Sequence, residues 1–406
     1  MANCSPAREF SNPFRPGAGH MPPYLAGREK EKEEFRRLLK QTVILENAVI
    51  TGLRGVGKTV LLDTLKPLAI SEGWGWVGTD LSESTSITEE RLALRLITDL
   101  AVVTSALTIS EEAVPGMGFR PEANRVRRTL DFELMRELYS QTPGLASDKL
   151  KAILEFVWHH LQHAGKRGLI FAYDEAQNLA DHAGKGEFPL SLMLDVFQSI
   201  QRKGIPFMLV LVGLPVLFPK LVEARTYSER MFRVIFLDRL GEADSQDAIL
   251  KPIEDCHSVL RLDSSLITLI IQVSGGYPYF IQFICREVYD VAIQKLGEGQ
   301  APAVPVEEIT RKLDSDFFAG RWARATDRQR ELLAVAACLE TSESEFTVQE
   351  VAEKSAEVLT KPFSPSHVSQ MLATLCDMGL VYKNRYGKYS FAVPLLGRFI
   401  FRQKNG

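Results

Sequence analysis

Five short runs rich in β-branched and aliphatic residues mark the first part of the chain, and amphipathic segments separate them. The runs cover residues 48–51, 75–81, 169–174, 207–212 and 234–237. Segments with helical spacing cover residues 88–107 and 149–163, and another places Phe35, Leu38 and Leu39 on one face. Strands that alternate with helices predict an α/β fold, with a parallel five-stranded sheet covered on both sides.

The middle of the chain has only helical patterns. These run from Gly241 to Leu296 and are interrupted once, at Gly275-Gly276-Tyr277-Pro278. A Gly- and Pro-rich stretch, residues 297–305, follows. Because Gly and Pro clusters mark connections, we expect an all-helical region that ends there.

Capping residues divide the C-terminal part into helices. Thr326 with Gln329 and Thr347 with Glu350 have capping-box spacing, and Ser364-Pro365 is typical of a third helix start. The third helix then has an apolar face, made of Val368, Met371, Leu372 and Leu375. Two short strand-like segments follow around a turn at residues 384–387. Three helices and a hairpin predict a winged helix.

Two stretches lack a clear pattern. The first 23 residues are rich in Pro, Gly, Ser and Asn, which predicts an extended arm. Residues 108–145 hold a basic cluster, Arg120, Arg125, Arg127 and Arg128. This stretch is either a functional insertion or a solvated loop, and we favour the loop.

Length and composition fit a protein of several domains. A chain of 406 residues is too long for one core, and its 45% hydrophobic and 24% charged residues are ordinary for globular structure. The longest apolar stretch, Ile205 to Phe218, is too short to cross a bilayer and reads as a buried strand. The N-terminus lacks a secretory pattern, so we expect a cytoplasmic protein. Five scattered cysteines without a C-x-x-C pair argue against zinc and favour reduced core residues.

The strongest chemical signal is Gly52-Leu53-Arg54-Gly55-Val56-Gly57-Lys58-Thr59, a complete G-x-x-x-x-G-K-[ST] phosphate loop between a predicted strand and a predicted helix. Glycines let successive N–H groups point inward, and the helix N-terminus adds partial positive charge. Lys58 would reach the β- and γ-phosphates, and the Thr59 hydroxyl would hold Mg²⁺. The predicted nucleotide contacts are Gly52, Arg54, Gly55, Val56, Gly57, Lys58, Thr59 and Val60.

An acid pair ends another predicted strand. Asp174 and Glu175 follow an apolar run, at the end of a parallel strand where ligands of such sheets bind. In this arrangement Asp174 contacts Mg²⁺, and Glu175 orients and deprotonates the attacking water. The alternative is that the pair only caps the next helix.

With these motifs in order, the chain resembles the AAA+/STAND class of P-loop NTPases, and most of all the branch of archaeal-type ATPases and origin-recognition initiators. Leu25-Ala26-Gly27-Arg28-Glu29-Lys30-Glu31 is similar to a box that lies against adenine in that branch. Asp174-Glu175-Ala176-Gln177 and Gly276-Tyr277-Pro278 resemble further marks of the class. The resemblance implies that ATP contacts Leu25, Gly27, Arg28 and Pro278, and that the helical region is a lid.

The resemblance implies assembly as a homo-oligomer with an arginine finger. The segment before the last strand holds Arg230, our candidate, and Arg233, the reserve. The alternative for Arg230 is a surface ion pair with Glu229 or Glu223. One departure is that Val212-Gly213-Leu214-Pro215 offers no polar residue to hold the attacking water, which predicts slow turnover.

The C-terminal part has a basic bias. From Lys361 onward the sequence has seven Lys or Arg residues and one acidic residue, Asp377, although the whole chain carries a net charge of −3. The third helix and the hairpin would bring Gln370, Lys383, Arg385 and Lys388 to double-stranded DNA. Alternatively this module packs on protein and relays the ATPase state.

These patterns divide the chain into an arm (1–23), a P-loop core (24–239), a helical lid with linker (240–320) and a winged helix (321–406). Two functions stay open. One is an ATP-driven switch that acts on DNA, and the other is a signalling scaffold with a separately encoded protein partner. No membrane contact is expected for either.

Overall fold

A computed structural model describes residues 11–17, 19–114, 124–299, 306–384 and 387–405. The chain divides into two compact units. One unit comprises residues 29–51 and 61–236, and the other comprises residues 1–28, 52–60 and 237–406. We describe each unit by itself.

The first unit is built on a five-stranded sheet. The strand order is β2 (Trp74–Val77), β5 (Gly168–Tyr173), β6 (Phe207–Gly213), β1 (Asn47–Gly52) and β7 (Phe232–Leu237). The pairs β2–β5, β5–β6 and β1–β6 are parallel. The predicted α/β fold with a five-stranded parallel sheet is therefore confirmed. Strand β2 ends at Val77, before the predicted end at residue 81. Strand β6 agrees with the run predicted over residues 207–212, but the longer apolar stretch from Ile205 to Phe218 is not one strand, since α7 begins at Leu217.

Apolar faces of the helices cover this sheet. The helices are α1 (Glu29–Leu39), α2 (Lys58–Ser71), α3 (Glu89–Thr104), α4 (Phe132–Gln141), α5 (Ala146–His163), α6 (Pro189–Arg202), α7 (Leu217–Ala224) and α8 (Ser228–Met231). Contacts join α3 to β2, α5 to β5 and α6 to β6. The rings of Phe171, Phe197 and Phe207 meet between these layers, all fully buried. As predicted, α1 buries Phe35, Leu38 and Leu39.

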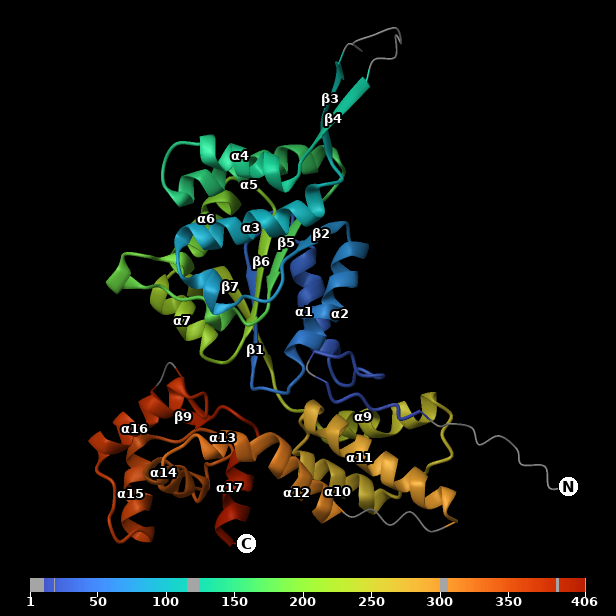
Figure 1. Cartoon of the computed structure of the whole chain (residues 1–406), viewed down its shortest axis with the longest axis vertical. Coiled ribbons are helices and arrows are strands. Elements are labelled where there is room, and N and C mark those ends of the chain that lie inside the picture. Colours follow the sequence, from blue (N-terminus) through green and yellow to red (C-terminus); the bar gives the residue numbers. More distant parts are fainter. Residues whose placement is uncertain (1–10, 18, 115–123, 300–305, 385–386, 406) are drawn as a thin grey trace, which may run out of the picture. The chain divides into compact units, whose positions relative to one another are not determined.

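A hairpin replaces the solvated loop that we favoured for the start of residues 108–145. Strands β3 (Thr108–Val114) and β4 (Asn124–Thr129) pair antiparallel, with Glu111 opposite Arg127. Figure 1 shows the hairpin extending beyond α4 and α5. Arg120 lies outside the described residues.

The second unit contains the helical region. It comprises α9 (Glu242–Asp255), α10 (Ser264–Ser274), α11 (Pro278–Gly297) and α12 (Val306–Leu313), then a π-helical turn (Asp314–Ala319) and α13 (Gly320–Ala323). Helices α9, α10 and α11 pack against one another (Figure 1). The described part of the N-terminal arm lies on α11, where Phe14 is buried against Tyr289 and the Asn12 amide donates to Asp290 at 2.7 Å.

The C-terminal part follows the predicted caps. Thr326 and Thr347 form reciprocal capping boxes that open α14 (Asp327–Ala337) and α15 (Val348–Val358), and Ser364 caps α16 (Pro365–Asp377). The apolar face of α16 is buried as predicted. Strands β8 (Val381–Lys383) and β9 (Tyr389–Phe391) then pair antiparallel, before α17 (Leu396–Asn405).

Ion pairs tie the C-terminal helix α17 to the rest of its unit. Arg398 donates to the Gln272 carbonyl of α10 at 2.7 Å and pairs with Glu343, which also lies 3.9 Å from Arg239. Arg402 forms a bidentate pair with the buried carboxylate of Asp314. Because Asp314 is largely removed from water, the bonds from Arg402 offset the cost of burying this side chain.

Two further observations bear on the sequence analysis. Cys285 is buried in the helical region, but Cys256 is exposed, so the cysteines are not all core residues. Within the described parts of the chain, every helix is too short or too polar to span a bilayer.

Candidate functional site

The loop between β1 and α2 has the backbone that a phosphate cradle requires. Gly55 and Gly57 have φ angles of +79° and +89°, a region that side chains rarely tolerate. Among the described residues that are not its chain neighbours, none has a heavy atom within 4 Å of the position that a Cβ on Gly57 would take. The loop therefore keeps an open space at the N-terminus of α2, where the partial positive charge of the helix end favours an anion.

Lys58 and Thr59 begin α2 and lie beside that space. The Lys58 ammonium donates to the carbonyls of Gly52 and Leu53 at 3.0 and 2.9 Å, so its charge folds over the loop. Both side chains are only half-buried. A triphosphate fits this donor set, because the ammonium can exchange weak carbonyl partners for charged phosphate oxygens.

Arg28 is a structural clamp for the loop. Its guanidinium is buried and donates at 2.9 Å both to the carbonyl of Val56 in the loop and to that of Asp238. The sequence motif indicated a contact with adenine, whereas the observed bonds fix the phosphate loop itself. Leu25 and Gly27 lie in the segment just before it, and their predicted contact with ATP stays a prediction.

The helical region touches the loop through α11. Pro278 begins this helix, and the next backbone N–H, that of Tyr279, donates to the Gly55 carbonyl at 3.1 Å. Beyond Tyr279, the ring of Phe317 carries the Arg321 guanidinium, 4.5 Å from its centre. Burial and the nearby charge of Arg54 lower the pKa of Arg321. No sequence pattern indicated that Arg321 lies this close to the loop, because its position depends on tertiary packing of the π-helical turn.

Asp174 and Glu175 directly follow strand β5. Asp174 is buried, and its Oδ1 accepts from the Glu175 N–H at 2.7 Å. Glu175 has a φ of +51°, an uncommon and strained value for a side chain of this type. The Glu175 side chain makes no capping bond to the short helix that follows, Ala176–Asn178. The geometry does not support the helix-cap alternative for Glu175.

Strand pairing brings the relevant strand ends to one edge of the sheet. Thr51 at the end of β1 pairs with Gly213, and Tyr173 at the end of β5 pairs with Leu211 on the same strand β6. The Thr51 hydroxyl is buried and has no hydrogen-bond partner among the described residues. An unsatisfied buried hydroxyl at the edge where α/β sheets bind ligands fits a site that takes up a bound molecule or its water.

Gln177 provides a polar side chain next to the apolar end of β6. Its amide oxygen accepts from the Leu214 N–H at 3.0 Å, and its amide nitrogen donates to the Glu175 carboxylate. The sequence motif contained this residue, but nothing in the pattern indicated a contact with β6.

The candidate arginine fingers are exposed. Arg230 lies at the end of α8 and Arg233 near the start of β7. Neither makes an ion pair with another described residue, so the proposed pairing of Arg230 with Glu229 or Glu223 is not observed. The neighbouring Arg225 is instead held by Asp195 at 2.6 Å.

The candidate DNA contacts lie on the last module. Gln370 on α16, Lys383 on β8 and Lys388 just before β9 are exposed, and Lys388 lies 4.0 Å from Glu345. Arg385 lies outside the described residues. The structure thus leaves the polar face of α16 and two hairpin lysines open to solvent.

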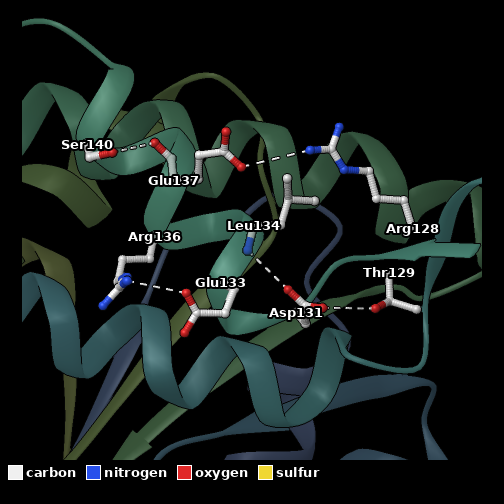
Figure 2. Close-up of a pocket in the computed structure, with 8 residues that line it drawn as sticks. All are labelled: Arg128, Thr129, Asp131, Glu133, Leu134, Arg136, Glu137 and Ser140. Carbon is white, nitrogen blue, oxygen red and sulfur yellow. Dashed lines mark hydrogen bonds and ion pairs between the residues drawn. The ribbon is translucent and has the colours of Figure 1, made fainter.

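A surface pocket of 670 Å³ lies at the base of the hairpin, lined by residues of β4 and α4. Figure 2 shows that both arginines of the lining point toward glutamates of α4. Arg128 lies 3.8 Å from Glu137, and Arg136 lies 3.3 Å from Glu133. Both cations already face a carboxylate, and the third carboxylate, Asp131, accepts hydrogen bonds from the Thr129 hydroxyl and the Leu134 N–H, so the charged groups of this pocket are engaged with one another and with the helix start.

Comparison with known proteins supports the fold. The model of a domain of unknown function (DUF8462) matches residues 315–400. No curated protein matched the chain. The Walker-type ATPase PABY2304 of Pyrococcus abyssi is similar with a TM-score of 0.56 at 14% identity, over 93% of this chain and 96% of that one. The ADP form of the Aeropyrum pernix ORC2 protein is similar with a TM-score of 0.51 at 16% identity, over 96% of each chain.

At these identities the likeness concerns architecture alone, and it extends over nearly the whole chain. Together with the parallel sheet, the phosphate loop after β1 and the helical region after β7, it confirms the resemblance found in the sequence at the level of fold. The chain has the fold of the AAA+ P-loop ATPases.

Proposed function

We propose that this protein is an ATP-binding and slowly hydrolysing AAA+ switch. The observation that carries the proposal is the open cradle at Gly57, with Lys58 and the N-terminus of α2 beside it. No other arrangement described above offers convergent donors for a triphosphate. The ATP contacts expected of the phosphate loop, Arg28 and Pro278 belong to this proposal.

Two carboxylates and a hydroxyl supply the chemistry in this proposal. Bound Mg²⁺ would neutralise charge on the phosphates. Thr59 and Asp174 are the residues that would hold it, and both are oxygen donors, which Mg²⁺ prefers. Glu175 would accept a proton from the attacking water, and its position after β5, at the edge where such sheets bind ligands, supports this role.

Replacing the base tests the chemistry. Glu175→Gln should keep Mg·ATP binding while turnover falls by about 100-fold or more, since the amide cannot accept the proton. Phosphate release under single-turnover conditions gives the rate, and Lys58→Ala serves as the variant without binding. Turnover in Glu175→Gln equal to that of the unchanged protein would refute the assigned base.

We further propose that Arg230 completes the site of a neighbouring copy in a homo-oligomer. Its exposure and lack of an ion pair among the described residues support this role, since a finger must be available to a second subunit. Mixing Arg230→Ala with Lys58→Ala subunits tests it. Turnover should recover in the mixture, because one interface then holds an intact loop and an intact Arg230. No recovery removes this role from Arg230.

Two uses of the C-terminal module compete, and we propose DNA binding by a winged helix as the first. The exposed Gln370, Lys383 and Lys388 support it. A specific observation favours the second use, packing on protein with a separately encoded partner as effector. Arg398 of α17 bonds to Gln272 of α10, so this module is already tied to the helical region. A rotation of the helical region would then move the C-terminal module with it.

A further inference from the structure

Gln177 joins two parts of the site that the sequence treats as separate. Its side chain donates to the Glu175 carboxylate on one side and accepts from the Leu214 N–H, at 3.0 Å, on the other. Glu175 follows β5, and Leu214 follows β6. A single side chain therefore spans the ends of two adjacent strands.

The orientation of the Gln177 amide follows from its partners. A backbone N–H such as that of Leu214 can only donate, so it must face the amide oxygen. The amide NH₂ group is then left to face Glu175, whose ionised carboxylate can only accept. The two strand ends fix the amide in one of its two possible settings.

The surroundings hold Gln177 in place. Its backbone carbonyl accepts from Lys220 at 2.7 Å, and burial lowers the pKa of that lysine. A Cβ on Gly213 would lie only 2.4 Å from the Gln177 amide oxygen. The glycine thus leaves the room that this amide needs against β6.

We infer that Gln177 is a positioning residue that aims the Glu175 carboxylate at the attacking water. It supplies from the β5 loop the polar anchor that Val212-Gly213-Leu214-Pro215 lacks. This inference rests on the proposed function, because it assigns Glu175 as the base. A bond from a fixed amide restricts the rotamers of Glu175, and its loss lets the carboxylate leave the productive geometry.

The first test separates positioning from binding. Gln177→Leu keeps the size of the side chain but removes both bonds. We expect turnover of the full-length protein to fall by about 10- to 100-fold, as small misplacements of a catalytic group can do, while ATP affinity stays within about twofold. A matched control is Asn178→Leu, which removes the neighbouring amide and its 2.8 Å bond to the Leu81 carbonyl without touching Glu175. This control should leave turnover nearly unchanged.

The second test uses Gly213. Gly213→Ala should slow turnover because the new methyl group displaces the Gln177 amide. In a Gln177→Ala background the 2.4 Å clash with the amide oxygen is gone, and only the contacts with Leu217 Cδ2 at 3.1 Å and the Gln177 backbone nitrogen at 3.3 Å remain, so the same methyl group should have a much smaller further effect. A non-additive cycle of these variants supports coupling through Gln177.

The outcomes distinguish this inference from the proposed function. If Lys58→Ala abolishes turnover but Gln177→Leu hydrolyses ATP as fast as the unchanged protein, the ATPase stands and the role of Gln177 is refuted. Multiplicative effects of Gly213→Ala and Gln177→Ala would also refute it. Equal loss of ATP affinity and turnover in Gln177→Leu would show a general structural role instead of positioning. Turnover that survives in Lys58→Ala would remove the proposed site and this inference with it.

Discussion

Single side chains give the phosphate loop its shape. The buried Arg28 guanidinium bridges the carbonyls of Val56 and Asp238 at 2.9 Å each, which joins the loop to the chain that follows β7. A planar guanidinium can reach two acceptors from one fixed position, whereas an ammonium acts as a single point. Arg28 therefore preorganises the loop before any ligand arrives.

Arg28→Lys should weaken Mg·ATP binding by about tenfold. Losing one hydrogen bond from a charged group costs about 1.5–3 kcal/mol, and 1.4 kcal/mol is a factor of ten in affinity. Titration calorimetry measures the change. Arg37→Lys, an exposed residue of α1, serves as the control and should bind as the unchanged protein does. Equal affinity for Arg28→Lys would contradict the clamp.

Sequence patterns predicted the two motifs of the site but not the side-chain contacts around them. The phosphate loop and Asp174-Glu175 follow strands as predicted, because a motif of fixed spacing between a strand and a helix is a local property. Gln177 and Arg321 escaped prediction, since their contacts join segments far apart in sequence. The contact of Gln177 with Leu214 depends on which strand neighbours β5.

At the scale of elements, caps set the helix boundaries of the C-terminal part. Thr347 accepts from the Glu350 N–H at 3.2 Å, and Glu350 accepts from the Thr347 N–H at 2.6 Å. Both N–H groups lie at the start of α15, where backbone N–H groups have no acceptor within the helix. The sequence predicted this box because a capping box is also local.

Thr347→Ala should lower the free energy of unfolding by about 1 kcal/mol, the usual worth of an N-cap. Guanidinium chloride denaturation followed by circular dichroism measures it. Thr374→Ala is the control, because Thr374 is exposed within α16 and caps nothing. If both variants unfold at the same denaturant concentration, the capping box contributes nothing to stability.

The β3–β4 hairpin shows where element prediction failed. Its strands place polar and charged residues opposite each other, such as Glu111 opposite Arg127 and Ser110 opposite Arg128. Strand patterns are recognised by alternating apolar residues, and a hairpin without an apolar face lacks them. Opposite charges across the strands stabilise such a pair without burial.

At the scale of the whole molecule, contacts of charged side chains hold the C-terminal module to the helical region of its unit. Hydrogen bonding from Arg398 is the main cause that lowers the pKa of Glu343 below its ordinary value of 4.5. Arg239 adds a second cation nearby. Because the folded pKa is depressed, the stabilising contribution of Glu343 is present above pH 4.5 and is lost as the pH falls through the folded pKa.

Glu343→Gln should therefore lower the free energy of unfolding only at pH values above the range in which Glu343 titrates. The expected loss near neutral pH is about 0.2–1 kcal/mol, because this pair is largely exposed. Denaturation midpoints of the variant and the unchanged protein should converge as the pH falls below 4.5 and through the folded pKa, because the carboxylate of the unchanged protein then becomes protonated. A gap between the two that persists or grows in acid would contradict this prediction.

DNA binding through the module makes a prediction about salt. Replacing Lys383, Arg385 and Lys388 with Gln should flatten the slope of log K against log[salt] by about three units or fewer, since each phosphate contact contributes about 0.9. The control replaces three exposed cations of α1 and its end, Lys30, Arg37 and Lys40, which changes the net charge equally. Fluorescence anisotropy with double-stranded DNA and ATP gives both slopes. No affinity for DNA with ATP present would leave the protein-packing function as the better proposal.

Calorimetric titration with Mg·ATP tests the nucleotide site most directly. We predict a saturable heat of binding for the unchanged protein and none for Lys58→Ala, because Lys58 supplies the charge beside the open cradle at Gly57. No heat with the unchanged protein, or the same isotherm with Lys58→Ala, would contradict a nucleotide site at this loop.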